Sequence, residues 1–336
     1  MIQVDNLSKY FGPVMAVDRI SFSVGRGEIV GFLGLNGAGK TTTMRILTSY
    51  MPATSGVARV AGHDVMLEST KVRQSIGYLP ESVPLYPEMR VEEYVDFRAK
   101  LKGMPRTERI KRVEYCLDRC RLVSVRRRLL STLSKGYRQR VGLADAMIHD
   151  PPIFILDEPT SGLDPQQIRE TLALLKELGE GHTILLSTHI LTEVEAICER
   201  VIVINSGRIG LDKRLEEIES ENVILLEVRG PADQITHLLQ GMPGVTSLVG
   251  KPVEENVTSF EIRASEEKDI REDVSKAIAA KHWVMRRLER KGRRLADAFF
   301  EVLRVSDPLK QPLPSAVAQA PQATSMAVPG SEAIQK

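Results

Sequence analysis

Short apolar runs alternate with helical patterns over residues 1–220. This rhythm is typical of an α/β protein, in which buried strands are separated by covering helices. Runs of four to six apolar residues suit strands that are buried on both faces. We therefore expect five central strands: EIVGFL (28–33), IGYL (76–79), IFILD (153–157), TILLS (183–187) and VIVI (201–204).

No strand pattern lies between Glu88 and Asp150. This interval shows helical spacing instead, in the segments VEEYVDFRAKLKG, RTERIKRVEYCLDRC and KGYRQRVGLADAMIHD. We expect a helical subdomain at about 88–150, inserted into a sheet domain that spans 1–220. The segment NSGRIGLDK, which follows the last central run, predicts a turn and an edge strand.

The pattern changes at about residue 221. VILLEV, SFEIRA and HWVMRRLER are expected to be strands, and PADQITHLLQG, EKDIREDVSKAIAAK and RRLADAFFEVLR helices. This alternation predicts a small α+β accessory domain over 221–305. Residues 306–336 are rich in Pro, Ala, Ser and Gln with almost no large apolar side chains, so we expect a disordered tail.

Composition narrows the class of protein. The chain has 336 residues, 42% of them hydrophobic, and a net charge of +2. That balance gives no general attraction to nucleic acid, so no nucleic-acid partner is expected. No apolar run is long enough to cross a bilayer, and the first residues lack the pattern of a signal peptide, so a cytoplasmic location is expected. Cys116 and Cys120 share a helix face without neighbouring His, which favours packing over metal binding.

GLNGAGKT, Gly34 to Thr41, fits the pattern G-x-x-x-x-G-K-[ST] and stands between an expected strand and an expected helix. In that position glycines let backbone N–H groups converge on phosphate, and the helix N-terminus adds its dipole. Lys40 is placed to reach the outer phosphates, and the Thr41 hydroxyl to bind Mg²⁺. A chance match in a Gly-rich turn is the alternative.

Two carboxylates end the run IFILD. Asp157 comes at the carboxyl end of the strand, where it can hold Mg²⁺, and Glu158 follows, where it can act as general base toward water. His189 follows another apolar run, where its imidazole could hydrogen-bond the γ-phosphate and orient the attacking water. A strand that ends in a solvated acidic turn, and a structural histidine, are the alternative readings.

A second anion site is suggested by LSKGYRQR. Ser134, Lys135 and Gly136 form a short polar loop that opens a helix, and a helix start offers free N–H groups to an anion. The chain already has a phosphate loop about a hundred residues earlier. The sequence alone does not say which phosphate the second site would bind.

Taken in order, these motifs resemble the ATP-binding subunit of ABC transporters over about residues 1–220. The resemblance implies a P-loop NTPase fold of the ABC type, with ATP and Mg²⁺ as cofactors. It also implies that Ser134 and Gly136 touch the nucleotide of a second, facing subunit, with Asp164 in a loop that crosses the dimer interface. A homodimer is expected.

The resemblance assigns the remaining site residues. Glu158 and His189 are implied as catalytic base and switch histidine, and Thr41, Asp157 and Glu81 as the Mg²⁺ site. Phe11 stands where the family stacks an aromatic ring on adenine, although a core position and the neighbouring Tyr10 remain open. The implied phosphate loop consists of Gly34, Leu35, Asn36, Gly37, Ala38, Gly39, Lys40 and Thr41, and Thr42 is expected to bind the nucleotide next to it.

Two departures point to one branch of the family. The signature is LSKGY where LSGGQ is commonest, and Glu81 stands where a glutamine is usual. GYLPE, PLYPEM and LSKGYRQRVGLA are similar to exporters of the ABC-2 type, especially the gliding-motility-associated and multidrug-type subunits. This resemblance implies a separate integral membrane permease, which holds the subunit on the inner face of the cell membrane. The permease is expected to dock near Glu81–Glu88 of this chain.

Two other classes fit the sequence less well. Non-transport ABC ATPases act on the ribosome or on DNA. The ATPases that act on the ribosome carry two nucleotide domains on one chain, and those that act on DNA contain long heptad coiled coils. This chain has one phosphate loop and no such repeat. A P-loop kinase or GTPase would leave LSKGYRQR, SGLD and His189 unexplained together.

Overall fold

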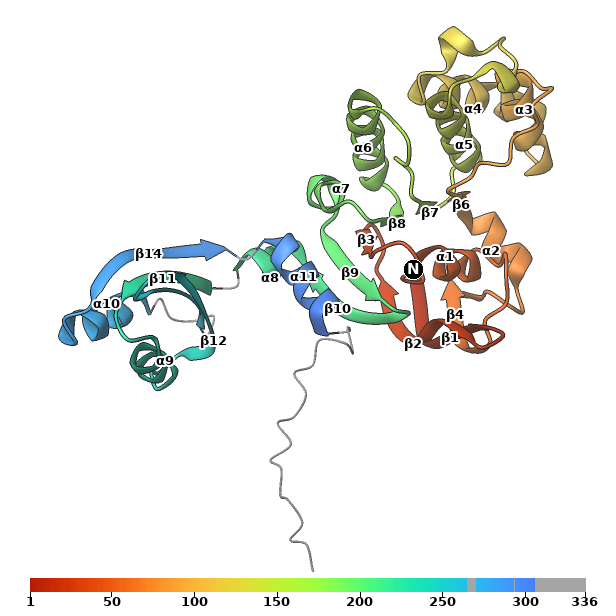
Figure 1. The fold of residues 1–336 in the computed structure, drawn as a ribbon. Coiled ribbons are helices and arrows are strands. Elements are labelled where there is room, and N and C mark those ends of the chain that lie inside the picture. Colours follow the sequence, from red (N-terminus) through yellow and green to blue (C-terminus); the bar gives the residue numbers. More distant parts are fainter. Residues whose placement is uncertain (221, 265–269, 293, 306–336) are drawn as a thin grey trace, which may run out of the picture. The chain divides into compact units, whose positions relative to one another are not determined.

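A computed structural model describes residues 1–220, 222–264, 270–292 and 294–305 (Figure 1). The predicted disordered tail, 306–336, lies outside the described residues. The described chain forms a six-stranded sheet and two four-stranded sheets. No helix in these ranges is long and apolar enough to cross a membrane.

The six-stranded sheet is the centre of the first 220 residues. Its order is β10-β9-β3-β8-β7-β6, with all neighbours parallel except β10, which is antiparallel to β9. The five predicted central strands and the predicted edge strand are confirmed. Their bounds are β3 (Ile29–Leu33), β6 (Ile76–Leu79), β7 (Ile153–Asp157), β8 (Thr183–Thr188), β9 (Arg200–Asn205) and β10 (Arg208–Arg214).

Successive side chains of each central strand point alternately into two different apolar cores. In β7, Ile153 and Ile155 join one apolar cluster, while Phe154 and Leu156 join the other. Because both faces are covered, the strands are apolar throughout rather than alternating. The first cluster contains α1 (Lys40–Leu47) and an antiparallel sheet β2-β1-β4-β5, which the apolar pattern of the sequence did not predict. Its strands are β1 (Ile2–Phe11), β2 (Val14–Val24), β4 (Ser55–Val60) and β5 (His63–Asp64).

Helices cover the opposite face. The predicted helical insertion is confirmed, and its three main helices join the same core as the helices that connect the later strands (Figure 1). The helices on this face are α3 (Val91–Leu101), α4 (Arg106–Arg119), α5 (Lys135–Met147), α6 (Pro165–Gly179), α7 (Leu191–Ile197) and α8 (Leu215–Ser220), with short 3₁₀ turns at Val123–Val125 and Leu130–Thr132. Helix α2 (Ser69–Ser75) instead contributes Val72 to the cluster that contains α1. Cys116 and Cys120 are buried in this core, as packing residues.

The strand register sets where polar groups gather. Leu33 of β3 pairs with Thr188 of β8, and Asp157 of β7 pairs with Ser187 of β8. The carboxyl ends of three neighbouring parallel strands are therefore level. In sheets of this kind, that edge is where ligands bind.

The predicted α+β domain follows. Its elements run β11 (Asn222–Arg229), α9 (Ala232–Gln240), β12 (Val245–Glu254), β13 (Val257–Ala264), α10 (Arg271–Ala280) and β14 (Val284–Gly292). The sheet is antiparallel with order β12-β13-β11-β14, which is a ferredoxin-like βαββαβ unit. Strand β12 was not predicted, because its residues are mostly exposed and lack an apolar pattern.

The last helix, α11 (Leu295–Val305), packs against the first 220 residues. Its apolar face joins the core that contains α7 and β9, with Phe299 and Val302 both buried. The approach is close, because a Cβ on Gly210 of β10 would collide with the Val302 side chain. After the ferredoxin-like unit, the chain thus returns to the part that contains the six-stranded sheet.

Two adjacent phenylalanines of α11 test this packing. Phe299 is 4% exposed and Phe300 is 52% exposed. We expect Phe299→Ala to lower the free energy of unfolding by about 3 kcal/mol, because it leaves a cavity in the core. Phe300→Ala should change it by less than about 0.5 kcal/mol. Denaturant unfolding of both variants measures the difference, and equal effects would contradict the packing of α11.

Candidate active site

A cavity of about 420 Å³ lies at the level carboxyl ends of the parallel strands. Its walls come from the loops that follow β3, β6, β7 and β8, from the start of α1 and from one residue of β2. Such a crevice at the edge of an open α/β sheet is a usual ligand site. The lining residues are Ala16, Asn36, Gly37, Gly39, Lys40, Thr41, Thr42, Glu81, Glu158, Ser161 and His189.

The phosphate loop closes one side of the cavity. Gly39 has φ +109°, and a Cβ there would come within 2.5 Å of the Ala16 carbonyl oxygen, so only glycine fits. Helix α1 begins next, at Lys40, and within the described residues no side chain caps its start. Its first N–H groups are therefore available to an anion, which fits a bound phosphate chain.

Lys40 is buried and makes three polar contacts. Its Nζ donates to the carbonyl oxygens of Gly34 at 2.8 Å and Leu35 at 3.2 Å. It also lies 3.3 Å from Glu158 Oε1 in a buried ion pair. The lysine charge is thus held between the phosphate loop and the carboxylate that follows β7.

Glu158 also contacts His189. Its Oε2 lies 2.9 Å from His189 Nδ1, so the Glu158 carboxylate lies between the Lys40 ammonium group and the His189 imidazole. The Glu158 backbone has φ +49°, a left-handed conformation that non-glycine residues rarely adopt. Two hydrogen bonds hold it, because the Glu158 N–H is 3.1 Å from both the carbonyl oxygen and Oγ of Ser187.

Asp157 has the geometry of a cation ligand. Its Oδ1 accepts from Ser187 Oγ at 2.5 Å and from Thr41 Oγ1 at 3.2 Å. In the described part of the chain, its Oδ2 is buried and has no hydrogen-bond partner. Burial raises the pKa of Asp157 above its ordinary value, and the charges of Glu81 and Glu158 add to this, against the two hydroxyl donors. A hydroxyl beside an unpartnered carboxylate oxygen fits Mg²⁺, which prefers oxygen ligands.

The proposed signature loop lies apart from this cavity. Ser134 is exposed and caps α5, with Oγ accepting from the Tyr137 N–H at 3.4 Å. Gly136 packs under the Gln167 side chain, where a Cβ would collide. Asp164 caps α6 by accepting from the Gln167 N–H at 2.9 Å. None of Ser134, Gly136 and Asp164 is among the residues that line the cavity.

Phe11 stands at the end of β1 and is half exposed, with Lys9 Nζ 5.2 Å from its ring centroid. It is not among the lining residues either, so its contact with a base stays a prediction. Glu81, by contrast, lies on the cavity wall with the phosphate loop. The structure thus brings together Glu81, Glu158, His189 and the phosphate loop in one chain.

Sequence reasoning missed several residues of the site. Ala16 comes from β2, a strand that carries no motif. Ser187 links Asp157 to the Glu158 backbone, and Ser161 lies on the cavity wall. The signal for Ser187 was its place next to Thr188 and His189, at the end of an apolar run.

The buried ion pair gives a testable prediction for the nucleotide-free protein. Lys40→Met leaves Glu158 Oε1 without its cation, so we expect the free energy of unfolding to fall by about 3 kcal/mol. Adding Glu158→Gln should recover at least about 1 kcal/mol, because the uncompensated charge is removed. Denaturant unfolding provides the measurement. Lys176→Met, at an exposed position on α6, is the matched control.

Comparisons with known proteins agree with this geometry. Residues 17–161 match the family model described as ABC transporter. An uncharacterised ABC transporter ATP-binding protein of Methanocaldococcus jannaschii is 38% identical over 265 residues, which cover 79% of this chain and 95% of that protein. The linearmycin resistance ATP-binding protein of Bacillus subtilis is 35% identical, over 68% of this chain and 76% of that one.

A solved structure is similar as well. It is a dimeric post-hydrolysis state of an ATP-binding cassette bound to ADP and phosphate. The likeness has a TM-score of 0.60 at 28% identity, over 64% of this chain and 99% of that one. The M. jannaschii relative is matched over nearly its whole length at well above 30% identity. This chain therefore belongs to the ATP-binding proteins of ABC transporters.

Proposed function

We propose that the chain is the ATP-hydrolysing subunit of a membrane exporter of the ABC-2 type. The observation that carries this proposal is the arrangement of Lys40, Glu158 and His189 around one cavity, with Asp157 Oδ2 unpartnered behind it among the described residues. A general base next to a phosphate-binding loop and a cation site is what phosphoryl transfer to water requires. The similarity to a cassette solved with ADP and phosphate supports hydrolysis.

Each side chain has a role in this proposal. Lys40, Thr42 and the start of α1 bind the phosphates. Thr41, Asp157 and Glu81 would hold Mg²⁺, which supplies charge neutralisation at the phosphates when bound. Glu158 accepts the proton of the attacking water, and His189 orients that water molecule. Phe11 stacks on the adenine ring.

The active form in this proposal is a dimer. Ser134 and Gly136, at the start of α5, would face the nucleotide held by the phosphate loop of a partner subunit. Asp164, which caps α6, would lie in the loop between the two sites. The dimeric cassette among the similar structures supports this arrangement, and a homodimer is the simplest form because this chain carries both half-sites.

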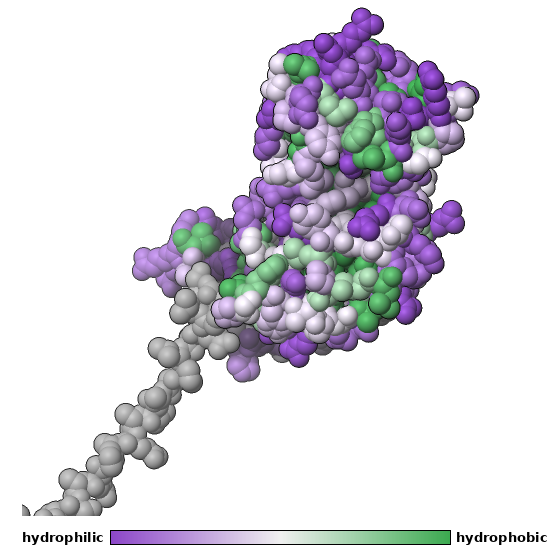
Figure 2. Space-filling view, turned by 90° about the vertical axis from the view of Figure 1, so that its right-hand side faces the viewer, coloured by the Kyte–Doolittle hydropathy of each residue, from purple (hydrophilic) through white to green (hydrophobic). Residues whose placement is uncertain are grey.

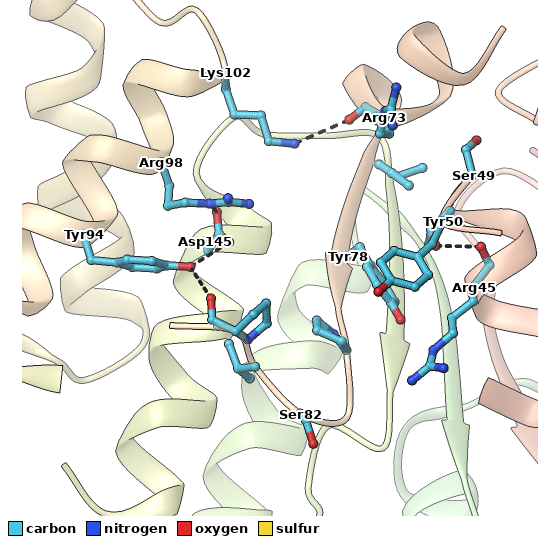
Figure 3. Close-up of a pocket in the computed structure, with 16 residues that line it drawn as sticks. Arg45, Ser49, Tyr50, Arg73, Tyr78, Ser82, Tyr94, Arg98, Lys102 and Asp145 are labelled. Carbon is cyan, nitrogen blue, oxygen red and sulfur yellow. Dashed lines mark hydrogen bonds and ion pairs between the residues drawn. The ribbon is translucent and has the colours of Figure 1, made fainter. Parts of the chain in front are cut away.

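A second cavity offers a place for the permease. It also measures about 420 Å³ and lies between the helical insertion and the end of α1 (Figure 3). Arg98 donates to Asp145 at 2.8 Å on one side, and Arg45 and Tyr50 lie across from them (Figure 3). The loop after β6 forms its rim through Ser82, Val83 and Pro84. We propose that a cytoplasmic helix of the permease binds in this groove.

The charge of the groove indicates what the permease helix carries. Arg45, Arg73, Arg98 and Lys102 line it against one acid, Asp145. Desolvation lowers the pKa of Lys102, and a carboxylate brought close to it would favour its charged form. The face of the molecule in Figure 2 is largely hydrophilic with small separate apolar patches. An acidic amphipathic helix fits this groove better than a purely apolar one.

The branch and domain organisation are proposed on the same basis. GYLPE and LSKGYRQRVGLA support the ABC-2 type, and the name of the linearmycin resistance relative supports export. We propose an ATP-binding domain at 1–220, with a helical subdomain at about 88–150, and an accessory domain at 221–305. The permease would then hold the protein on the cytoplasmic face of the membrane. A non-transport ATPase acting on ribosome or DNA is the alternative.

The dimer can be tested directly. Glu158→Gln removes the general base but keeps the shape of the side chain, so we expect ATP hydrolysis to fall by at least about 100-fold. ATP should then remain bound and hold two chains together. Size-exclusion chromatography with light scattering, with and without Mg-ATP, measures the mass. A monomer at saturating Mg-ATP would contradict the proposed sandwich.

The permease can be captured with the same variant. Tagged Glu158→Gln protein, purified with ATP from detergent-solubilised cells, should bring down a polytopic membrane protein in stoichiometric amount. Adding Lys102→Glu, in the groove, should abolish this capture, whereas adding Lys100→Glu, near it in sequence but outside the groove, should not. Mass spectrometry identifies the partner. Ribosomal proteins or DNA without a membrane protein would favour the non-transport alternative.

A further inference from the structure

A buried glutamate outside the cavity connects two loops of the site. Glu193 lies in the first turn of α7 and is only 2% exposed. Its Oε1 accepts from Thr160 Oγ1 at 2.5 Å, and its Oε2 accepts from Thr188 Oγ1 at 2.6 Å. Both threonines are buried as well. The carboxylate therefore bridges two hydroxyls that water does not reach.

The two threonines flank the reacting side chains. Thr160 comes two residues after Glu158, in the turn that follows β7, and Thr188 directly precedes His189 at the end of β8. Thr188 Oγ1 also accepts from the Ile190 N–H at 3.0 Å, which closes the backbone around His189. One carboxylate thus fixes the turn of Glu158 and the turn of His189 relative to each other.

A bridge of this kind has a physical cost and needs a reason. A buried carboxylate is unfavourable unless hydrogen bonds compensate it, and an apolar residue would serve packing alone at lower cost. The hydroxyl donors and the start of α7 compensate the charge of Glu193. What the charged bridge adds is a fixed distance between Glu158 and His189, whose side chains meet at 2.9 Å.

We propose that Glu193 is a positioning residue for ATP hydrolysis, acting through Thr160 and Thr188 on the Glu158–His189 pair. This inference rests on the proposed function. It assigns Glu193 no contact with nucleotide or cation, and the residue is not among those that line the cavity. Displacement of a catalytic group by about 1 Å can cost about 100-fold in rate. Loss of the bridge should therefore slow the reaction while ATP binding is retained.

The test compares Glu193→Gln with Glu195→Gln. Glu195 is exposed on the same helix, so this control makes the same change of charge and shape without touching the bridge. The amide that replaces the Glu193 carboxylate has a single oxygen to accept from a hydroxyl, so one threonine O–H loses its acceptor. We expect kcat to fall at least about tenfold for Glu193→Gln, with KM for ATP within about threefold of the wild type. Glu195→Gln should leave both unchanged.

A second variant removes the bridge from the other end. Thr160→Val has nearly the shape of threonine but lacks the hydroxyl. It should lower kcat in the wild-type background and have little further effect in a Glu193→Ala background, because the acceptor is already gone. Additive effects in this double-mutant cycle would overturn the proposal. This variant also keeps the proposal testable if Glu193→Gln does not fold.

Hydrogen exchange provides a readout that needs no ATP. In the nucleotide-free protein, Glu193→Gln should raise deuterium uptake in peptides that cover 153–164 and 184–195, and not elsewhere, whereas Glu195→Gln should not. An unchanged pattern with wild-type kcat would overturn the inference, as would equal losses of kcat, ATP binding and thermal stability. A wild-type protein that hydrolyses no ATP would instead refute the proposed function, and exchange would still report on the bridge.

Discussion

The parallel hydrogen bonding of β3, β7 and β8 is the constraint on which the site depends. Register brings Leu33 level with Thr188, and Asp157 level with Ser187. The phosphate loop, the two carboxylates and His189 then leave the sheet at the same edge. A shift of one residue in β7 would exchange its two buried faces and would move Asp157 out of level with Ser187.

Burial of charge is concentrated at that edge. Lys40, Asp157, Glu158 and Glu193 are all nearly inaccessible, although charged side chains are rarely buried. Each is compensated locally, by an ion pair, by hydroxyl donors or by a helix start. Among the described residues, Asp157 Oδ2 and the start of α1 still have capacity for a ligand. A bound phosphate chain and a cation can therefore complete the compensation of charge at this edge.

The C-terminal part of the described chain contributes residues to two different cores. The ferredoxin-like sheet has its own core, formed by residues of β11, β13, α9 and α10. The chain then returns, and α11 adds Phe299 and Val302 to the core beside α7 and β9. Helix α7 carries Glu193, which bridges the turns of Glu158 and His189. Helix α11 therefore packs against the helix that positions these two turns.

The central strands, the helical insertion and the phosphate loop could be predicted from the sequence, because each depends on local pattern. An apolar run of five residues, or a glycine-rich turn before a helix, has its meaning within one segment. The sheet of β1, β2, β4 and β5 and the strand β12 were missed, since they are partly exposed and their pairing depends on more than local pattern.

The sequence by itself determined which residues are candidates for the chemistry: Lys40, Thr41, Asp157, Glu158 and His189. Only the tertiary structure decided that Ser187 and Glu193 hold them and that α11 packs beside α7. Thr160 and Glu193 are 33 residues apart, so nothing in either segment indicates the other. Their contact exists because β7, β8 and α7 are packed together, and burial then forces each polar atom to find its partner among residues brought close by the fold.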